Sequence, residues 1–166
     1  ALLGVENGLP VGDDPEWVKI FHDAGARYMG ITHFGHNQLG DSSNPNPDLG
    51  DEATRHGGLS DIGRQMIAEM NHWGIIPDVS HAAMTTTIEM ARLSKAPIMA
   101  SHSGVRAVAD VERNLSDEAL FAIRDNGGVA QMVALGSYVK KDPERDAARQ
   151  ALRDKFGIKG SSDIAN

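Results

Sequence analysis

The sequence predicts an α/β protein of the (β/α)8, or TIM-barrel, type, present as a partial barrel of about five βα units. Short apolar runs alternate regularly with helical patterns, which is typical of parallel strands joined by crossover helices. Polar side chains end several of these runs, and a βα barrel collects its functional groups at such strand ends. Length alone favours an open sheet of flavodoxin type, because 166 residues are fewer than the roughly 250 of a complete barrel.

The strands are predicted from apolar runs that have the length of buried strands. The runs IIPDVSH and APIMASH both end on a histidine, and VAQMVAL follows two glycines. We expect the five strands at residues 1–6, 27–33, 75–81, 96–102 and 129–135.

Capping residues and glycines delimit the helices that connect these strands. Asp14 and Pro15 are the expected N-cap and first helical position of the first helix, which Gly25 ends. Ser60 and Ser116 are expected to cap two of the later helices. We expect helices at residues 15–24, 61–73, 82–95, 117–126 and 143–156.

One connection, residues 34–58, is long and rich in Gly, Asn, Asp, Ser and Pro, and it has no periodicity. A loop of this length inside a compact domain is usually functional or mobile. It begins directly after His33, so we expect it to border the ends of the strands.

Composition excludes several classes of function. The 23 acidic and 16 basic residues give a formal net charge of −7, so the sequence lacks the excess of basic residues typical of nucleic-acid-binding proteins. No apolar run is long enough to span a membrane, and residues 1–15 lack the basic start and apolar centre of a secretory signal. Without cysteine, any metal must be held by His, Asp or Glu. The compartment stays open between cytoplasm and periplasm.

Four residues at different strand ends are the candidates for chemistry: Glu6, His33, His81 and His102. Glu6, His81 and His102 form a set of two histidines and one carboxylate, which suits zinc and leaves a coordination position open. Each has an ordinary alternative: a strand-end histidine is often only hydrogen-bonded, and Glu6 can cap the following turn.

Two further alternatives concern the other histidines. His33 can order the long loop by hydrogen bonding to Asn37 or Asp41 instead of contacting a substrate. The remaining histidines lie in predicted helix surfaces or in the loop, and we expect them to be solvated; they are residues 22, 36, 56 and 72.

Arg113 lies in the loop after the fourth strand and is followed by Asn114 and a helix start. A guanidinium there can reach over the strand ends and bind a carboxylate with two hydrogen bonds. The alternative is a surface arginine paired with Asp110 or Glu112. Asn114 is a further candidate for substrate binding.

Five stretches taken together closely resemble the membrane (renal) dipeptidase family of zinc peptidases, and they cover residues 4 to about 138. They are GVENG, GITHFGHNQLGDSS, GLSDIGRQMIAEMNHWGIIPDVSH, SKAPIMASHSGVRAVADVERNLSDEAL and NGGVAQMV. The resemblance implies a βα barrel with two zinc ions that hydrolyses the peptide bond of dipeptides through a metal-activated water. Members of the family often accept a D-residue at the C-terminal position.

The resemblance also implies a role for each candidate. Glu6 is expected to bridge the two metals, and His81 and His102 are expected to bind the second zinc. His33 matches the histidine that contacts the scissile group, and Arg113 matches the arginine that binds the substrate carboxylate. His33 and Arg113 are thus the expected catalytic residues, and both bind substrate with Asn114.

Two motifs of the family are missing from this sequence: a His-x-Asp pair before Glu6, which completes the first zinc, and a GSDFDG-like stretch near the end of the barrel. We therefore expect residues 1–166 to be a single domain that is an internal fragment of a metal-dependent hydrolase barrel. This chain alone is then expected to hold one zinc and to be stable only when it pairs with another chain, as in a homodimer. The alternatives are an inactive remnant that binds one metal or small peptides, and a metal-free binding domain of flavodoxin type.

Overall fold

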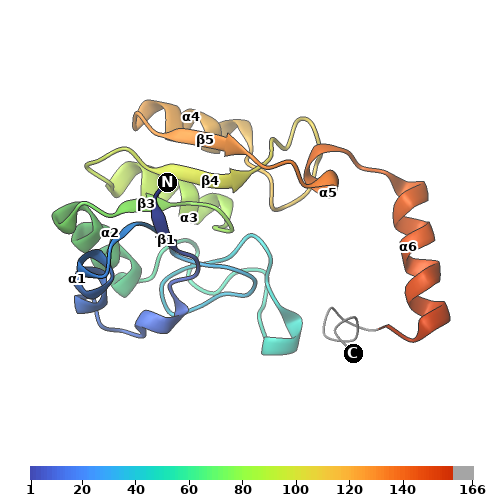
Figure 1. The fold of residues 1–166 in the computed structure, drawn as a ribbon, viewed down its shortest axis with the longest axis horizontal. Helices are drawn as coiled ribbons and strands as arrows, with labels where there is room; N and C mark the ends of the chain where they lie inside the picture. Colours follow the sequence, from blue (N-terminus) through green and yellow to red (C-terminus); the bar gives the residue numbers. More distant parts are fainter. Residues whose placement is uncertain (159–166) are drawn as a thin grey trace.

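Five parallel strands form one sheet in the computed structural model, which describes residues 1–158. The strands follow one another across the sheet in chain order (Figure 1). This is the strand order of a (β/α)8 barrel, whereas a flavodoxin-type sheet has the order 2-1-3-4-5. The predicted fold class is confirmed and the flavodoxin-type alternative is wrong. The strands are β1 (Leu3–Val5), β2 (Ala26–Gly30), β3 (Ile76–Asp78), β4 (Met99–Ser103) and β5 (Val129–Met132).

Four helices connect successive strands and lie together on one side of the sheet (Figure 1). Each packs against the next along the chain, which places them in a single outer layer. Each new strand is added on the same side of the previous one. Right-handed crossovers then place all the connecting helices on the same face of the sheet. The helices are α1 (Glu16–Asp23), α2 (Asp61–Trp73), α3 (Met84–Leu93) and α4 (Asp117–Asp125).

The helix caps follow the predicted pattern with one shift. Ser60 accepts a hydrogen bond from the Gly63 N–H at 3.0 Å, and Ser116 caps α4 in the same way. The first helix begins one residue later than predicted, because Pro15 takes the N-cap position. Asp14 still supports the helix start, since its Oδ1 accepts a hydrogen bond from the Glu16 N–H at 2.9 Å.

Four of the five strands end earlier than the apolar runs from which they were predicted. The sheet pairing of β1, β2 and β3 stops before Glu6, His33 and His81, which lie in the turns that follow. Only His102 lies inside its strand. The predicted fifth strand also ends at Met132, and a short helix α5 (Gly136–Val139) follows it. The backbone leaves the sheet at its carboxyl edge, and this places the candidate side chains there.

The core lies between the sheet and the helical layer, and part of the long loop belongs to it. Met29 of β2, Ile98 just before β4, Met66 of α2 and Met90 of α3 are fully buried. Leu39 of the 34–58 loop is also fully buried among these side chains. The loop contains a short 3-10 helix, η2 (Pro47–Leu49); another, η1 (Leu9–Val11), follows β1. The loop is thus packed onto the body of the protein and can position residues near the strand ends.

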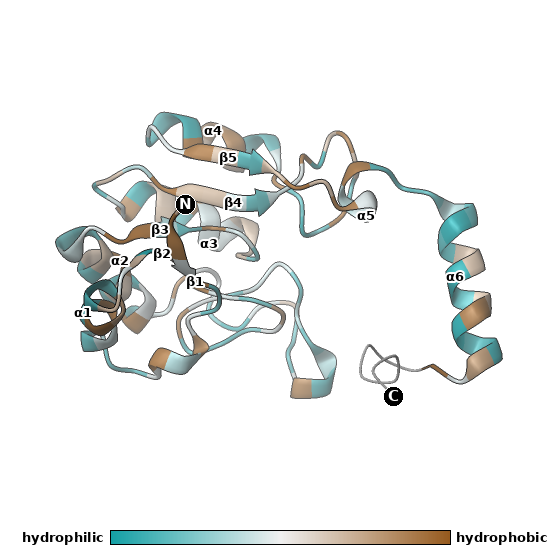
Figure 2. Ribbon diagram, in the orientation of Figure 1, coloured by the Kyte–Doolittle hydropathy of each residue, from teal (hydrophilic) through white to brown (hydrophobic). Residues whose placement is uncertain are grey.

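The last helix, α6 (Pro143–Phe156), forms as predicted but stands apart from the sheet and its helices (Figure 1). None of its residues is buried, and hydrophilic and hydrophobic residues alternate along it (Figure 2). None of the helices formed within residues 1–158 combines the length and apolar character needed to cross a membrane.

Candidate metal centre

Three potential metal ligands from three strands meet at the carboxyl edge of the sheet. The Nε2 atoms of His81 and His102 are 3.1 Å apart. Glu6 Oε1 lies 3.3 Å from His81 Nε2 and 3.1 Å from His102 Nε2. The structure therefore brings together one carboxylate and two imidazoles whose ligand atoms face one another.

The backbone is unusual at two positions in this cluster. Among the described residues other than glycine, only Asn7 and His81 have positive φ angles, of 74° and 70°. Such angles are uncommon outside glycine and cost free energy, and they concentrate at functional sites. Asn7 follows Glu6 directly, and its Oδ1 accepts hydrogen bonds from the Leu9 N–H and the Asn37 amide. Sequence patterns gave no signal for this backbone geometry, which turns the chain where Glu6 and His81 leave their strands.

His33 lies beside the cluster. Its Nε2 is 3.7 Å from Glu6 Oε1, and its ring centroid is 4.1 Å from that of His81. The alternative in which His33 orders the loop through Asn37 or Asp41 is not seen, because both side chains bond elsewhere. The His33 ring instead lies against the candidate ligands at the carboxyl edge of the sheet.

Phe34 adds an apolar surface next to these polar groups. Its ring packs edge-on against His33 and His81, with centroid separations of 4.6 and 5.2 Å, yet it is 55% exposed. No sequence pattern pointed to Phe34, because an aromatic residue in an aperiodic loop carries no positional signal. It gives the cluster one hydrophobic wall.

His81 is the most deeply buried of the three candidate ligands. Burial lowers the pKa of His81 to about 3, and the positive charges of Arg113, His33 and His102 act in the same direction. His81 is therefore uncharged at neutral pH, and the neutral imidazole is the form that binds metal ions.

Arg113 points into the protein and not toward solvent. It is 4% exposed, its Nη1 donates to Ser103 Oγ at 2.9 Å, and its Nη2 donates to the His102 carbonyl at 2.8 Å. The alternative of a surface pair with Asp110 or Glu112 is wrong. Burial lowers the pKa of Arg113, although a guanidinium stays charged in proteins. Within the described residues its buried Nε has no hydrogen-bond partner.

Asn114 is 1% exposed and holds the surrounding loops together. Its amide nitrogen donates to the carbonyls of Ala109 and Tyr138 at 2.7 and 2.9 Å. Its Oδ1 is buried and has no partner among residues 1–158. The role of Asn114 in substrate binding stays a prediction.

The long loop is organised around Asp41, which is almost fully buried. Its carboxylate accepts hydrogen bonds from the Thr54 hydroxyl at 2.6 Å and from the backbone N–H groups of Arg55, His56 and Gly57. Burial raises the pKa of Asp41, but these hydrogen bonds outweigh that effect and hold the pKa below its usual value. Asp41 thus fixes residues 54–57, near the C-terminal end of the loop.

The prediction that His36 is solvated is wrong, because its side chain is fully buried. His36 Nδ1 accepts a hydrogen bond from the Ser42 N–H at 3.0 Å, and its Nε2 donates to the Glu52 carbonyl at 3.0 Å. Ser42 Oγ in turn contacts the carbonyls of His33 and His81. The loop is therefore tied to the backbone beside the candidate metal ligands.

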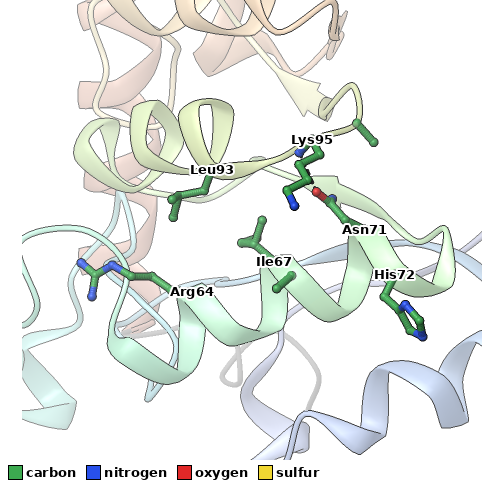
Figure 3. Close-up of a pocket in the computed structure, with 8 residues that line it drawn as sticks. Arg64, Ile67, Asn71, His72, Leu93 and Lys95 are labelled. Carbon is green, nitrogen blue, oxygen red and sulfur yellow. Dashed lines mark hydrogen bonds between the residues drawn. The ribbon is translucent and has the colours of Figure 1, made fainter.

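A cavity of about 450 Å³ lies elsewhere, between α2 and the end of α3 (Figure 3). It is lined by Arg64, Ile67, Asn71, Leu93 and Lys95 among others, and by none of the candidate ligands. This cavity belongs to the outer helical layer, so it is separate from the candidate ligands at the strand ends.

Comparison with known proteins identifies the family. A family model described as membrane dipeptidase (peptidase family M19) matches residues 1–156. This chain belongs to the membrane dipeptidase family. The M19 chain is 35% identical over 151 residues to dipeptidase aclJ of Aspergillus oryzae, covering 91% of the chain and 34% of aclJ. It is 33% identical to dipeptidase tcpJ of Claviceps purpurea, covering 87% of the chain and 33% of tcpJ. The chain thus spans about one third of the length of these relatives.

Solved structures agree with this assignment. The M19 chain superimposes on the probable dipeptidase PvdM from Pseudomonas aeruginosa with a TM-score of 0.86 and 37% identity, covering 95% of this chain and 40% of PvdM. A metallopeptidase from Rhodobacter sphaeroides, liganded with a phosphinate mimic of the dipeptide L-Ala-D-Ala, gives a TM-score of 0.72 at 26% identity, covering 94% of this chain and 46% of that protein.

Proposed function

We propose that the protein carrying this sequence is a zinc-dependent dipeptidase in which Glu6, His81 and His102 bind one metal ion. The observation that carries this proposal is the triangle of ligand atoms, with sides of 3.1 to 3.3 Å. Ligand atoms of a tetrahedral zinc site, each at about 2.0–2.2 Å from the metal, are about 3.3–3.6 Å apart, which is only slightly wider than this triangle. The three residues therefore fit zinc, and they leave a coordination position open as catalytic zinc sites do.

The surrounding residues suit peptide-bond hydrolysis. A zinc ion bound there would polarise the substrate carbonyl and lower the pKa of water to about 7. His33, which lies 3.7 Å from Glu6, would donate a hydrogen bond to the negative charge that develops on the carbonyl oxygen. Phe34 would keep water away from one side of the scissile bond.

Arg113 supplies the proposed specificity for short peptides. Its hydrogen bonds to Ser103 and to the His102 carbonyl fix the plane of the guanidinium, and its buried Nε–H is left for an anionic partner. A substrate carboxylate is the planar anion that such a group recognises best. We propose dipeptides, including those with a C-terminal D-residue, as the substrate class, with Asn114 helping to hold them. The L-Ala-D-Ala mimic bound to the Rhodobacter sphaeroides relative supports this choice.

The test combines zinc content with hydrolysis of L-Ala-D-Ala. The purified chain, dialysed in a metal-buffered solution, should retain one equivalent of zinc and lose it in His81→Asn. Retention of zinc with no hydrolysis by this chain or by a longer form of the protein would favour the alternative of a binding protein without catalysis. A chain that retains no zinc would contradict the proposed metal site.

A further inference from the structure

A hydrogen-bond relay connects the candidate ligand His102 to a buried carboxylate on the neighbouring strand. Asp78, at the end of β3, is 3% exposed. Its Oδ2 accepts a hydrogen bond from the Ser101 hydroxyl. The Ser101 hydroxyl also lies 2.7 Å from His102 Nδ1, the ring nitrogen that does not face Glu6. Neither Asp78 nor Ser101 is one of the three candidate ligands.

The donors and acceptors in this relay have one consistent arrangement. Asp78 Oδ1 accepts the backbone N–H groups of Ser80 and Ser101 at 2.9 and 3.0 Å. A carboxylate can only accept hydrogen bonds, so the single hydroxyl hydrogen of Ser101 must point to Asp78 Oδ2. The Ser101 oxygen is then left as an acceptor, and His102 Nδ1 must carry the hydrogen. His102 Nε2 is therefore the nitrogen with a free lone pair.

The opposite tautomer would break this arrangement. It would turn the Ser101 hydroxyl toward His102 Nδ1 and leave the buried Oδ2 of Asp78 without its donor. An unsatisfied buried acceptor costs about 1–3 kcal/mol, and a charged one costs more. Only the first tautomer directs the Nε2 lone pair into the triangle formed with Glu6 and His81.

Strand β4 is locally irregular where the relay is built. Its register against β5 shifts between Ala100 and Ser103. Such irregularities redirect side chains and recur next to active sites. Ser80 Oγ accepts the His102 N–H at 3.0 Å, which fixes the backbone of His102. The Ser80 hydroxyl also lies 3.2 Å from Ser101 Oγ, whose second lone pair can accept its hydrogen.

We propose that Asp78 and Ser101 are positioning residues that hold His102 in the tautomer needed to bind the metal. This inference rests on the proposed metal site, and it assigns a function to two residues outside the ligand set. Outer partners of this kind orient metal-bound histidines, and losing one typically weakens metal affinity about 10- to 100-fold.

The first measurement is made on the metal-free chain. Two-bond ¹H–¹⁵N correlation spectra at alkaline pH, where imidazoles are neutral, report which nitrogen of His102 carries the hydrogen. We expect the hydrogen on Nδ1 in the wild type. In Asp78→Asn we expect it on Nε2, because the new amide NH2 must replace Oδ2 and donate to Ser101. The hydrogen on Nε2 in the wild type would overturn the proposal.

The second measurement is zinc affinity by competition with a chromophoric chelator. Ser101→Ala should weaken zinc binding about 10- to 100-fold, and Ser101→Thr, which keeps the hydroxyl, should restore most of it. Ser94→Ala is the matched control, because Ser94 is buried and hydrogen-bonded to Asn71 and Ala96 away from the site. Equal affinities for Ser101→Ala and Ser94→Ala would overturn the proposal. A wild type that binds no zinc would instead refute the proposed function, while the tautomer still tests the relay.

Discussion

His81 and His102 are 21 residues apart in the chain, yet their Nε2 atoms lie 3.1 Å from each other. Two unprotonated ring nitrogens at this distance repel each other unless a cation or a hydrogen lies between them. Glu6 completes the triangle and supplies the negative charge that a divalent cation requires. A cation held by all three groups, as proposed above, would satisfy both ring nitrogens.

Protonation of His81 should make the metal-free chain less stable in acid. The folded chain holds the pKa of His81 at about 3, whereas the unfolded chain has a pKa near 6.5. Between these values the unfolded state binds more protons, so the free energy of unfolding falls as the pH is lowered from about 6.5 to about 3. Urea unfolding at neutral and mildly acid pH measures this loss, which should reach a few kcal/mol.

The control for this prediction is His81→Asn, because asparagine tolerates the positive φ angle at this position. The variant should lose less stability between neutral and mildly acid pH than the wild type does. An identical loss in both proteins would show that His81 is not the group responsible.

Replacing Arg113 with lysine should impair binding of the substrate carboxylate. In a full-length form with the proposed dipeptidase activity, Arg113→Lys should raise KM for L-Ala-D-Ala about tenfold or more and lower kcat less, because a lysine cannot form the two-point contact. The same dipeptide with an amidated C-terminus is the control substrate, and its KM should hardly change. An unchanged KM for the free dipeptide would refute the assigned role.

Removing the Asp41 carboxylate should destabilise the long loop. Asp41→Ala leaves the N–H groups of Arg55, His56 and Gly57 without their acceptor, which should cost about 3 kcal/mol or more. Urea unfolding measures the loss, and hydrogen exchange should show faster exchange at residues 55–57. Asp48→Ala, an exposed position in the same loop, should change stability by less than about 0.5 kcal/mol. Equal effects of the two substitutions would contradict the role given to Asp41.

Much of the fold could be predicted because it depends on local patterns. Apolar runs and capping residues located all five strands and their connecting helices, and the polar strand ends favoured the barrel over the open sheet. The convergence of Glu6, His81 and His102 follows from the same pattern, since parallel strands end at one edge. Four of the five strand ends were placed too late, because hydropathy does not show where sheet pairing stops.

The remaining features depend on tertiary contacts that a sequence pattern does not carry. His36 lies in an aperiodic loop, and only its hydrogen bonds with the Ser42 N–H and the Glu52 carbonyl explain why it is not solvated. The inward direction of Arg113 depends on Ser103 and the His102 carbonyl, which become its neighbours only in the folded chain. The relay through Ser101 likewise depends on the packing of β3 against β4.

X-ray absorption spectroscopy at the zinc edge of the loaded chain tests the metal site most directly. We predict two imidazole nitrogens and one carboxylate oxygen at about 2.0–2.2 Å from zinc. His81→Asn and His102→Asn should each remove one imidazole contribution or abolish binding, and the exposed His72→Asn should change nothing. A zinc spectrum without two imidazoles, or one unaffected by substituting either His81 or His102, would contradict a site built from these strand ends.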